Sequence, residues 1–191
     1  MKILNNKLYI IIFIFSLIFY KGASSDEIAR ECFDKGYKLD IHGKYKESIK
    51  YYNKAIEFNP DYYEVYYNNA KNFLYLGLYD STIIYINKYN KIDSEYYLAW
   101  YIKGYANIYL NKYGEALKCI DKTIYFINIY YDFFILNYYL SSLLGKTGFV
   151  KYFYNNIILI NKYNNDVLIN KGAILSKLGR YEDALKCFSN V

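Results

Sequence analysis

Residues that carry most reaction chemistry are scarce in this sequence. It contains one histidine, His42, and it has no CxxC or HExxH spacing of the kind that binds metals. The segment Gly145-Lys146-Thr147 lacks the upstream glycine of a phosphate-binding loop. A lone histidine cannot supply a nucleophile, a base and an orienting group together. We therefore expect no enzyme, no catalytic residues, no cofactor, no metal and no small-molecule substrate.

A large excess of one charge is absent as well. The formal net charge is +6, and Lys2, Lys7 and Lys21 all lie before residue 26, which leaves about +3 for the rest of the chain. A balance this small is not the electrostatic footprint of a nucleic-acid-binding protein. Apolar residues make up 54% of the chain, enough for a sizeable core, and tyrosine is unusually abundant with 29 residues.

The first 25 residues differ from the remainder. Lys2 and Lys7 precede an apolar run over residues 8–20, which as a helix would span about 20 Å, less than the ~30 Å hydrocarbon core of a bilayer. Ala23 and Ser25 then provide the small residues of a signal-peptidase site. Residues 1–25 are predicted to be a cleaved signal peptide, so the chain is expected to be exported, periplasmic or secreted. The alternative is an uncleaved membrane anchor formed by residues 8–20.

A repeat with a period of 34 residues organises everything that follows. One column contains residues suited to tight turns: Gly43, Gly77, Asn111, Gly145 and Gly179. A second column is small except for one tyrosine: Gly36, Ala70, Gly104, Tyr138 and Gly172. Apolar residues recur at helical spacing on both sides of each turn, as Cys32, Gly36 and Leu39 do. Each unit is thus predicted to be two amphipathic helices that cross closely at the small column, and Pro60 marks the end of a second helix.

Three segments carry a family resemblance: Trp-x-x-x-Gly at 100–104, Gly-Arg-Tyr-Glu-Asp-Ala-Leu-Lys-Cys-Phe at 179–188, and Lys-Ala-Ile-Glu-Phe-Asn-Pro at 54–60. They resemble the tetratricopeptide repeat. The resemblance implies an all-α fold, a right-handed α-solenoid of antiparallel helix pairs, over residues 26–191. Its units would be 29–62, 63–96, 97–130, 131–164 and an incomplete 165–191.

The three cysteines fit this organisation without a disulfide framework. Cys119 and Cys187 are two whole repeats apart, which places them at equivalent positions on separate helices, too far apart for a bridge. With Cys32 they are expected to be small buried hydrophobic residues.

Two departures from the repeat pattern lead to further expectations. Tyr138 and Val150 are bulky residues in columns that are otherwise small, so the helices of the fourth unit should splay or Tyr138 should rotate outward. The chain also ends at Val191 inside a helix without a polar cap. The face around Leu175, Leu178, Ala184 and Phe188 could then pair with a second copy, or the chain could be a truncated remnant or an accessory subunit.

The resemblance also implies a binding site, because first helices line the concave surface of such solenoids and hold peptides there. The predicted groove consists of Phe33, Tyr37, Tyr67, Lys71, Tyr75, Tyr101, Tyr105, Tyr109 and Tyr139. Arg30, Ile41, Glu64, Leu98 and Ile135 are expected to flank it. Tyrosines supply rigid contact area with polar tips, which suits an extended or helical peptide.

Relatives that clamp a chaperone's C-terminal carboxylate use Lys, Asn and basic residues at positions occupied here by Phe33, Tyr37, Asn68, Leu98 and Ile102. Only Asn68 matches, so carboxylate clamping is not expected. The leading hypothesis is a non-enzymatic interaction module that binds a protein or peptide partner outside the cytoplasm. The alternative is a self-associating or membrane-tethered scaffold, and contact with a membrane is expected only through an uncleaved N-terminus.

Overall fold

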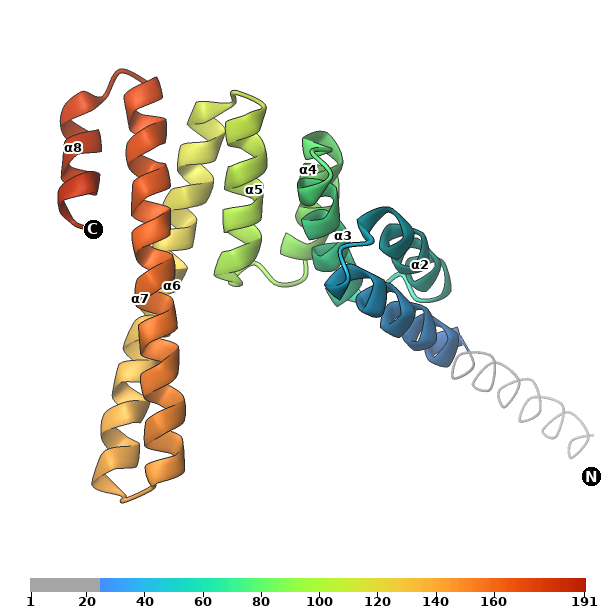
Figure 1. Ribbon diagram of the computed structural model, residues 1–191, viewed down its shortest axis with the longest axis horizontal. Coiled ribbons are helices and arrows are strands. Elements are labelled where there is room, and N and C mark those ends of the chain that lie inside the picture. The colour runs from blue at the N-terminus through green and yellow to red at the C-terminus, as the bar shows by residue number, and fades with distance from the viewer. Residues whose placement is uncertain (1–24) are drawn as a thin grey trace, which may run out of the picture. The chain divides into compact units, whose positions relative to one another are not determined.

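A computed structural model describes residues 25–191 of the chain (Figure 1). The predicted signal peptide therefore lies outside the described residues, apart from Ser25. Within the described range, all regular secondary structure is α-helical. A first helix covers residues 25–41 and is followed by α2 (Tyr45–Phe58), α3 (Tyr63–Tyr75), α4 (Tyr79–Asn90), α5 (Tyr97–Tyr109), α6 (Tyr113–Leu143), α7 (Thr147–Lys177) and α8 (Tyr181–Ser189).

The predicted turn column is confirmed at all five positions. Gly43 and Gly179 have φ of 71° and 74°, in the left-handed region where a side chain is strained. Asn111 has φ of 56° and is the one non-glycine residue in the described chain with a positive value, as expected for the residue type that tolerates this conformation best. Each turn lies between two successive helices, so the turn column keeps the repeat in phase.

The chain divides into two compact units, Met1–Gly77 and Leu78–Val191. The described part of the first unit contains the helix over residues 25–41 with α2 and α3. Tyr52, Ala55 and Val65 form its buried centre. A Cβ added at Gly36 would lie 2.7 Å from the ring of the buried Tyr52, so the absence of a side chain at Gly36 is what allows these two helices to cross.

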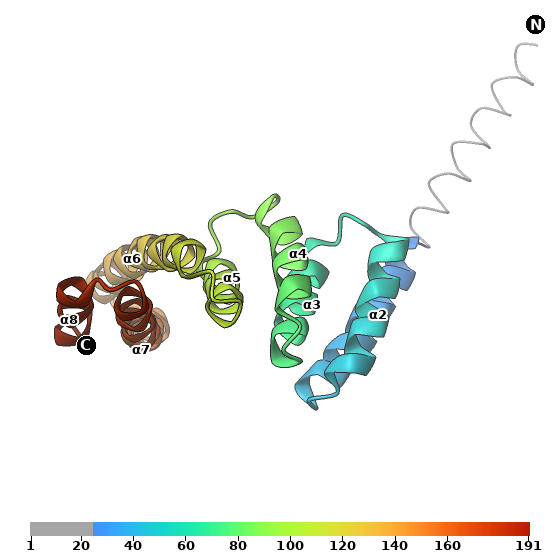
Figure 2. The same cartoon turned by 90° about the horizontal axis from the view of Figure 1, so that it is seen from above.

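In the second unit, α4 packs against α5, α5 against α6, α6 against α7 and α7 against α8. Figure 2 looks along α5, α6, α7 and α8 and shows their order. The predicted close crossings recur here: a Cβ at Gly104 would lie 3.0 Å from Ile120, and one at Gly172 would lie 2.5 Å from Phe188. The largest core cluster contains residues of α6 and α7: Ala116, Ile120, Ile127, Ile160, Val167 and Ile174.

Helices α6 and α7 are each 31 residues long, about twice the length that the repeat pattern predicts. The expected unit boundaries at 130/131 and 164/165 fall inside them. The reason lies in the sequence: Asn59-Pro60-Asp61 separates α2 from α3, whereas Ile127-Asn128-Ile129 contains neither proline nor glycine. Without such a residue, the second helix of one repeat continues as the first helix of the next.

This continuity makes residues 131–159 a two-helix projection, which we call the hairpin arm. It consists of the second half of α6 and the first half of α7, and it extends past the ends of α5 and α8 (Figure 1). The second half of α7, residues 165–177, packs beside the first half of α6, residues 113–130. The ring of Tyr97 lies 5.5 Å from that of Tyr130 and 6.2 Å from that of Tyr163, so the chain leaves and re-enters the packed part of this unit at one place.

Candidate peptide-binding surface

A ladder of tyrosines follows one face of α5. Tyr101, Tyr105 and Tyr109 are four residues apart, which aligns their side chains along the helix. The ring centroids are 5.8 Å apart between the first two and 5.4 Å apart between the last two. Tyr79, at the start of α4, extends the ladder by stacking on Tyr109 at 4.7 Å with an angle of 7° between the rings. The rings thus hold one another in fixed positions before any ligand arrives.

The solvent exposure of the tyrosine side chains increases along the ladder. The side chain of Tyr109 is 53% exposed, whereas Tyr101 and Tyr105 are half-buried. Burial, followed by the neighbouring tyrosine, raises the pKa of both Tyr101 and Tyr105, so their hydroxyl groups stay protonated and can donate hydrogen bonds. Tyr101 also packs against the α6–α7 core. The accessible part of the ladder is therefore its Tyr105–Tyr109 end.

Asn170 is a site residue that the sequence pattern did not identify. Its Nδ2 donates a hydrogen bond to the Tyr101 hydroxyl over 3.0 Å, from a position 69 residues further along the chain. The regular repeat predicted that the first helix of the fourth unit, 131–164, would lie beside α5 with Ile135 and Tyr139. The structure puts residues 165–177 there instead, and Tyr139 lies on the hairpin arm, 60% exposed. The missing helix break near residue 130 was the signal that could have revealed this.

The first unit contains a separate group of the predicted groove residues. Phe33 is half-buried, and its ring lies 6.3 Å from Tyr37, 5.6 Å from Tyr52 and 5.0 Å from Tyr62. Tyr37 is 49% exposed. Phe33 thus joins the core of this unit to its surface, and Tyr37 provides accessible area next to it.

Tyr75 forms a second exposed aromatic pair in this unit. Its ring stacks on Tyr45 at 4.9 Å with an angle of 27°, and its side chain is 59% exposed. Tyr67 is half-buried on the same helix. The flanking residues have mixed exposure: Arg30, Ile41 and Glu64 are exposed, and Leu98 and Ile135 are half-buried.

Lys71 has a structural partner. Its Nζ lies 2.8 Å from Oδ2 of Asp40, a carboxylate that is only 5% exposed, and the Tyr52 hydroxyl donates to the same oxygen over 3.5 Å. A buried carboxylate without a cation would be costly, so Lys71 neutralises Asp40 first of all. Burial and the charge of Asp40 also hold the pKa of Tyr52 well above its usual range.

The residue types associated with reaction chemistry are dispersed. His42 is exposed in the turn between the first helix and α2, and its Nδ1 lies 2.6 Å from the carbonyl oxygen of Lys38. Cys119 and Cys187 are buried, Cys32 is half-buried, and all three are free thiols. Burial raises the pKa of the Cys119 thiol, which makes it unreactive. Among residues 25–191, no three His, Cys, Asp or Glu side chains come together as metal ligands would.

No helix within residues 25–191 combines the length and the apolar character needed to cross a bilayer.

The helix pairs, their glycine crossings and their left-handed turns define an α-solenoid repeat protein. Residues 41–77 match a family described as TPR repeat, and residues 166–191 match one described as tetratricopeptide repeat. The chain therefore contains tetratricopeptide repeats. Such repeats are protein–protein interaction modules and not enzymes, so the chain has the architecture of an interaction scaffold.

Solved structures agree with this fold. MamA 41-end from Desulfovibrio magneticus RS-1 is 10% identical, with a TM-score of 0.62 over 85% of this chain and 72% of that chain. The TPR domain of Arabidopsis OM64 is 22% identical, with a TM-score of 0.52 over 53% of this chain and 84% of that one. The first TPR of Spaghetti (RPAP3), bound to the HSP90 peptide SRMEEVD, is 25% identical, with a TM-score of 0.51 over 53% and 80%. A sequence search of curated proteins gave no significant match.

Proposed function

We propose that this protein holds a peptide segment of a partner protein on the tyrosine ladder of α5. The observation that carries the proposal is the stacked series from Tyr101 to Tyr109 and Tyr79, which ends in an exposed ring. Preorganised tyrosines lose little conformational entropy on binding and combine apolar area with a hydrogen-bonding tip. Asn170 extends the polar part of this surface, because its amide reaches the ladder at Tyr101.

The partner segment is proposed to be recognised through apolar contacts and tyrosine hydroxyls, and not through a terminal carboxylate. The RPAP3 domain is bound to an HSP90 peptide, SRMEEVD, which ends in Glu-Glu-Val-Asp. Of the positions that relatives use for a carboxylate clamp, this chain keeps Asn68 alone. The one lysine in the predicted groove, Lys71, is paired with Asp40. We further propose that binding takes place outside the cytoplasm, on the basis of the apolar N-terminal segment and its small residues at 23–25.

The test is capture of partners from the native cell envelope by photocrosslinking, with identification of the crosslinked peptide. One variant combines Tyr105→Ala with Tyr109→Ala and keeps Tyr101, because that ring packs on the core. The matched control combines Tyr125→Ala and Tyr181→Ala, which remove two tyrosines that are 62% and 67% exposed outside the ladder. Loss of the crosslinked peptide in the ladder variant alone, with unchanged helicity, is the expected result. Equal capture by both variants would contradict the proposal.

The alternative interface at the C-terminal end has less free surface than the sequence indicated. Leu175 and Ala184 are each only 2% exposed, because they pack together with Cys187 between α7 and α8. Leu178 and Phe188 stay 41% and 45% exposed. Two of the four residues expected on that face thus belong to the interior of the unit, which favours the ladder as the primary binding surface.

A further inference from the structure

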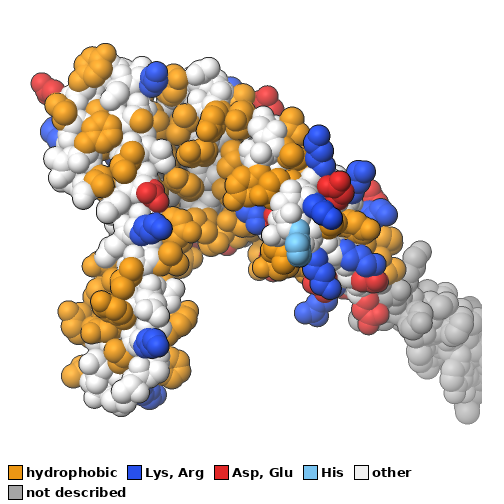
Figure 3. Space-filling model, in the orientation of Figure 1, with side chains coloured by type: hydrophobic (Ala, Val, Ile, Leu, Met, Phe, Trp, Pro, Cys, Tyr) orange, Lys and Arg blue, Asp and Glu red, His pale blue; other side chains and the backbone are white. Residues whose placement is uncertain are grey.

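The hairpin arm buries very little of its apolar surface. From residue 131 to residue 159, Ser141 and Ile157 alone are buried. Large hydrophobic side chains from both helices are exposed instead: Phe133, Leu136, Tyr139, Leu140, Leu143, Leu144, Phe149, Tyr152, Tyr154, Ile158 and Leu159. Figure 3 shows hydrophobic side chains along this projection. Apart from Tyr131 and Phe134, which pack on the core cluster at the base of the arm, the two helices depend mainly on each other for contacts. Such a pair is a marginal structure in water, so its exposed faces need a partner.

The extent of this surface is that of a protein interface. With about half of each of these large side chains exposed, the arm presents roughly 1,000 Å² of apolar area. The largest apolar patch on an ordinary monomer is about 300–600 Å², and each partner in a stable complex buries about 800 Å². The area of the arm is therefore sufficient for a stable dimer.

Charge is depleted over the same residues. The arm has three charged side chains, Asp132, Lys146 and Lys151, and two of these lie close to the turn at Gly145. Depletion of charge is the compositional signature of the centre of an interface, and a net charge near zero avoids repulsion between identical surfaces. Polar residues such as Asn137, Asn155 and Asn156 interrupt the apolar faces, which suits contact with protein better than with lipid tails.

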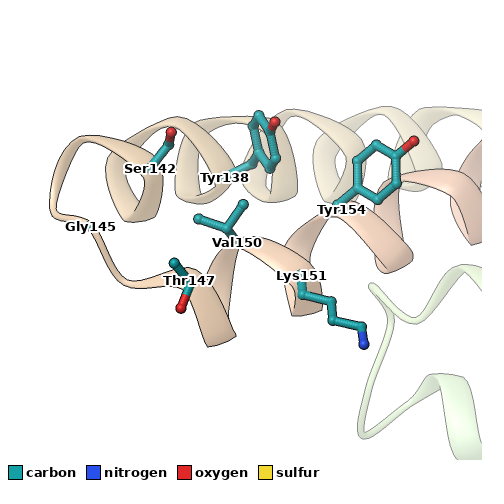
Figure 4. A pocket seen from close by; sticks show the side chains of 7 residues that line it. All are labelled: Tyr138, Ser142, Gly145, Thr147, Val150, Lys151 and Tyr154. Atoms are coloured by element: carbon teal, nitrogen blue, oxygen red, sulfur yellow. The ribbon is translucent and has the colours of Figure 1, made fainter.

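The two helices of the arm also leave a hollow between them. In the first, third and fifth repeats, a glycine meets a large side chain at the crossing point. In the arm, Tyr138 faces Tyr154 at 6.3 Å between ring centroids, and a hollow of about 500 Å³ lies beside them (Figure 4). Val150 and Thr147 line it from the other helix. An open hollow with largely apolar walls can accept side chains from an opposing helix, as the holes between packed helices do.

From these observations we infer that the hairpin arm pairs with the arm of a second copy of this chain in an antiparallel four-helix bundle. Repeats of this kind bury their faces against other repeats, and most of the fourth repeat has no neighbouring repeat, since the fifth packs directly on the third. A second copy supplies the same unpaired repeat. Under two-fold symmetry, each arm contributes exposed leucines to the interface and contacts the leucines of the other arm. The same surface is then used on both subunits, so the assembly contains only two chains.

Sedimentation velocity and light scattering on the intact protein, over a wide range of concentration, test this inference. The wild-type chain is expected to be a dimer. Leu136→Glu combined with Leu143→Glu, at side chains that are 59% and 84% exposed, should weaken dimerisation by at least about a hundredfold, because symmetry buries each new carboxylate twice. Leu178→Glu combined with Leu185→Glu, at side chains 41% and 67% exposed near the C-terminus, should leave the dimer intact.

Crosslinking keeps the inference testable if the glutamate variant folds poorly. Tyr139→Cys should yield covalent dimers with a bifunctional maleimide, and Tyr181→Cys, at a similarly exposed tyrosine, should not exceed the wild-type background. A monomeric wild-type chain, or a dimer that survives the arm substitutions, would overturn the inference. Co-sedimentation of a monomer with lipid vesicles that is lost in the arm variant would assign the surface to membranes instead.

Discussion

The first and fourth repeats show how one position determines whether a pair of helices packs closely. In residues 29–62, Gly36 lies directly against the buried ring of Tyr52, and the pair closes into a core. In residues 131–164, Tyr138 occupies the column of Gly36 and Tyr154 that of Tyr52, so two rings meet where one fits. The first pair is tightly packed, and the fourth encloses a hollow and keeps its large side chains in solvent. Close crossing thus depends on a missing side chain more than on the apolar pattern.

The two repeats also differ in whether a helix ends at the repeat boundary. Asn59 and Pro60 end the first repeat, whereas α7 continues through the corresponding position at Lys162 and α6 through that at Asn128. The residue that ends a helix therefore also determines which repeats become neighbours, because continuous helices carry the fourth repeat away from the third.

The largest expected effect concerns this continuity. Asn128→Pro places proline in the middle of α6, where it removes a backbone hydrogen bond and clashes with the preceding turn, and should lower the free energy of unfolding by about 3 kcal/mol or more. Ser94→Pro, at the equivalent repeat position between α4 and α5, should cost less than about 1 kcal/mol. Urea denaturation followed by circular dichroism measures both. Equal costs would mean that α6 is interrupted near residue 128 in solution.

A smaller effect is expected at the glycine crossing. Gly36→Ala puts a methyl group 2.7 Å from the Tyr52 ring, and displacement of that buried ring should cost about 1–3 kcal/mol. Gly148→Ala in the hairpin arm meets nothing within 4 Å and should be neutral or stabilise by about 0.5 kcal/mol. Thermal denaturation measures the melting temperatures of the two variants. A shift of both melting temperatures in the same direction would contradict the comparison.

The smallest effect is a dependence of stability on pH in the packed part of the second unit. Burial, with smaller contributions from Tyr96, Tyr163 and Tyr130, raises the pKa of Tyr97 to about 12, above the value of about 10 for a free tyrosine. The folded state keeps this proton after the unfolded chain has lost it. The free energy of unfolding should therefore be constant with respect to Tyr97 below about pH 10 and fall as the pH rises to 12.

Tyr97→Phe should reduce this alkaline loss of stability, measured by urea denaturation at a series of pH values. Tyr139→Phe, at a side chain 60% exposed on the hairpin arm, serves as the control and should follow the wild-type curve. An unchanged pH profile in Tyr97→Phe would contradict the assignment.

The local structure was predictable from the sequence, and the arrangement of repeats was not. The turn at Gly43 and the close approach at Gly36 follow from residue type and the 34-residue period, and the structure confirms both. The bulky Tyr138 in a column of small residues was also recognisable from the sequence. What the period could not reveal is that residues 113–143 form one helix, because a repeat alignment counts positions and does not test whether a helix ends between them.

The candidate site shows the same division. The spacing of Tyr101, Tyr105 and Tyr109 predicts a shared helix face, and the structure stacks them there. Asn170 could not be placed beside them from the sequence, since its position depends on the fifth repeat packing where the fourth was expected. Contacts within a helix follow from local spacing, whereas contacts between repeats depend on which helices are continuous.

The return of the chain to Tyr97 has a consequence for how the hairpin arm is connected to its unit. Tyr130 and Tyr163 reach the same ring from the two ends of one complete repeat. Helices α6 and α7 each continue as helix from the arm into the packed part of this unit. A displacement of the arm is therefore transmitted through two continuous helices to the residues around Tyr97.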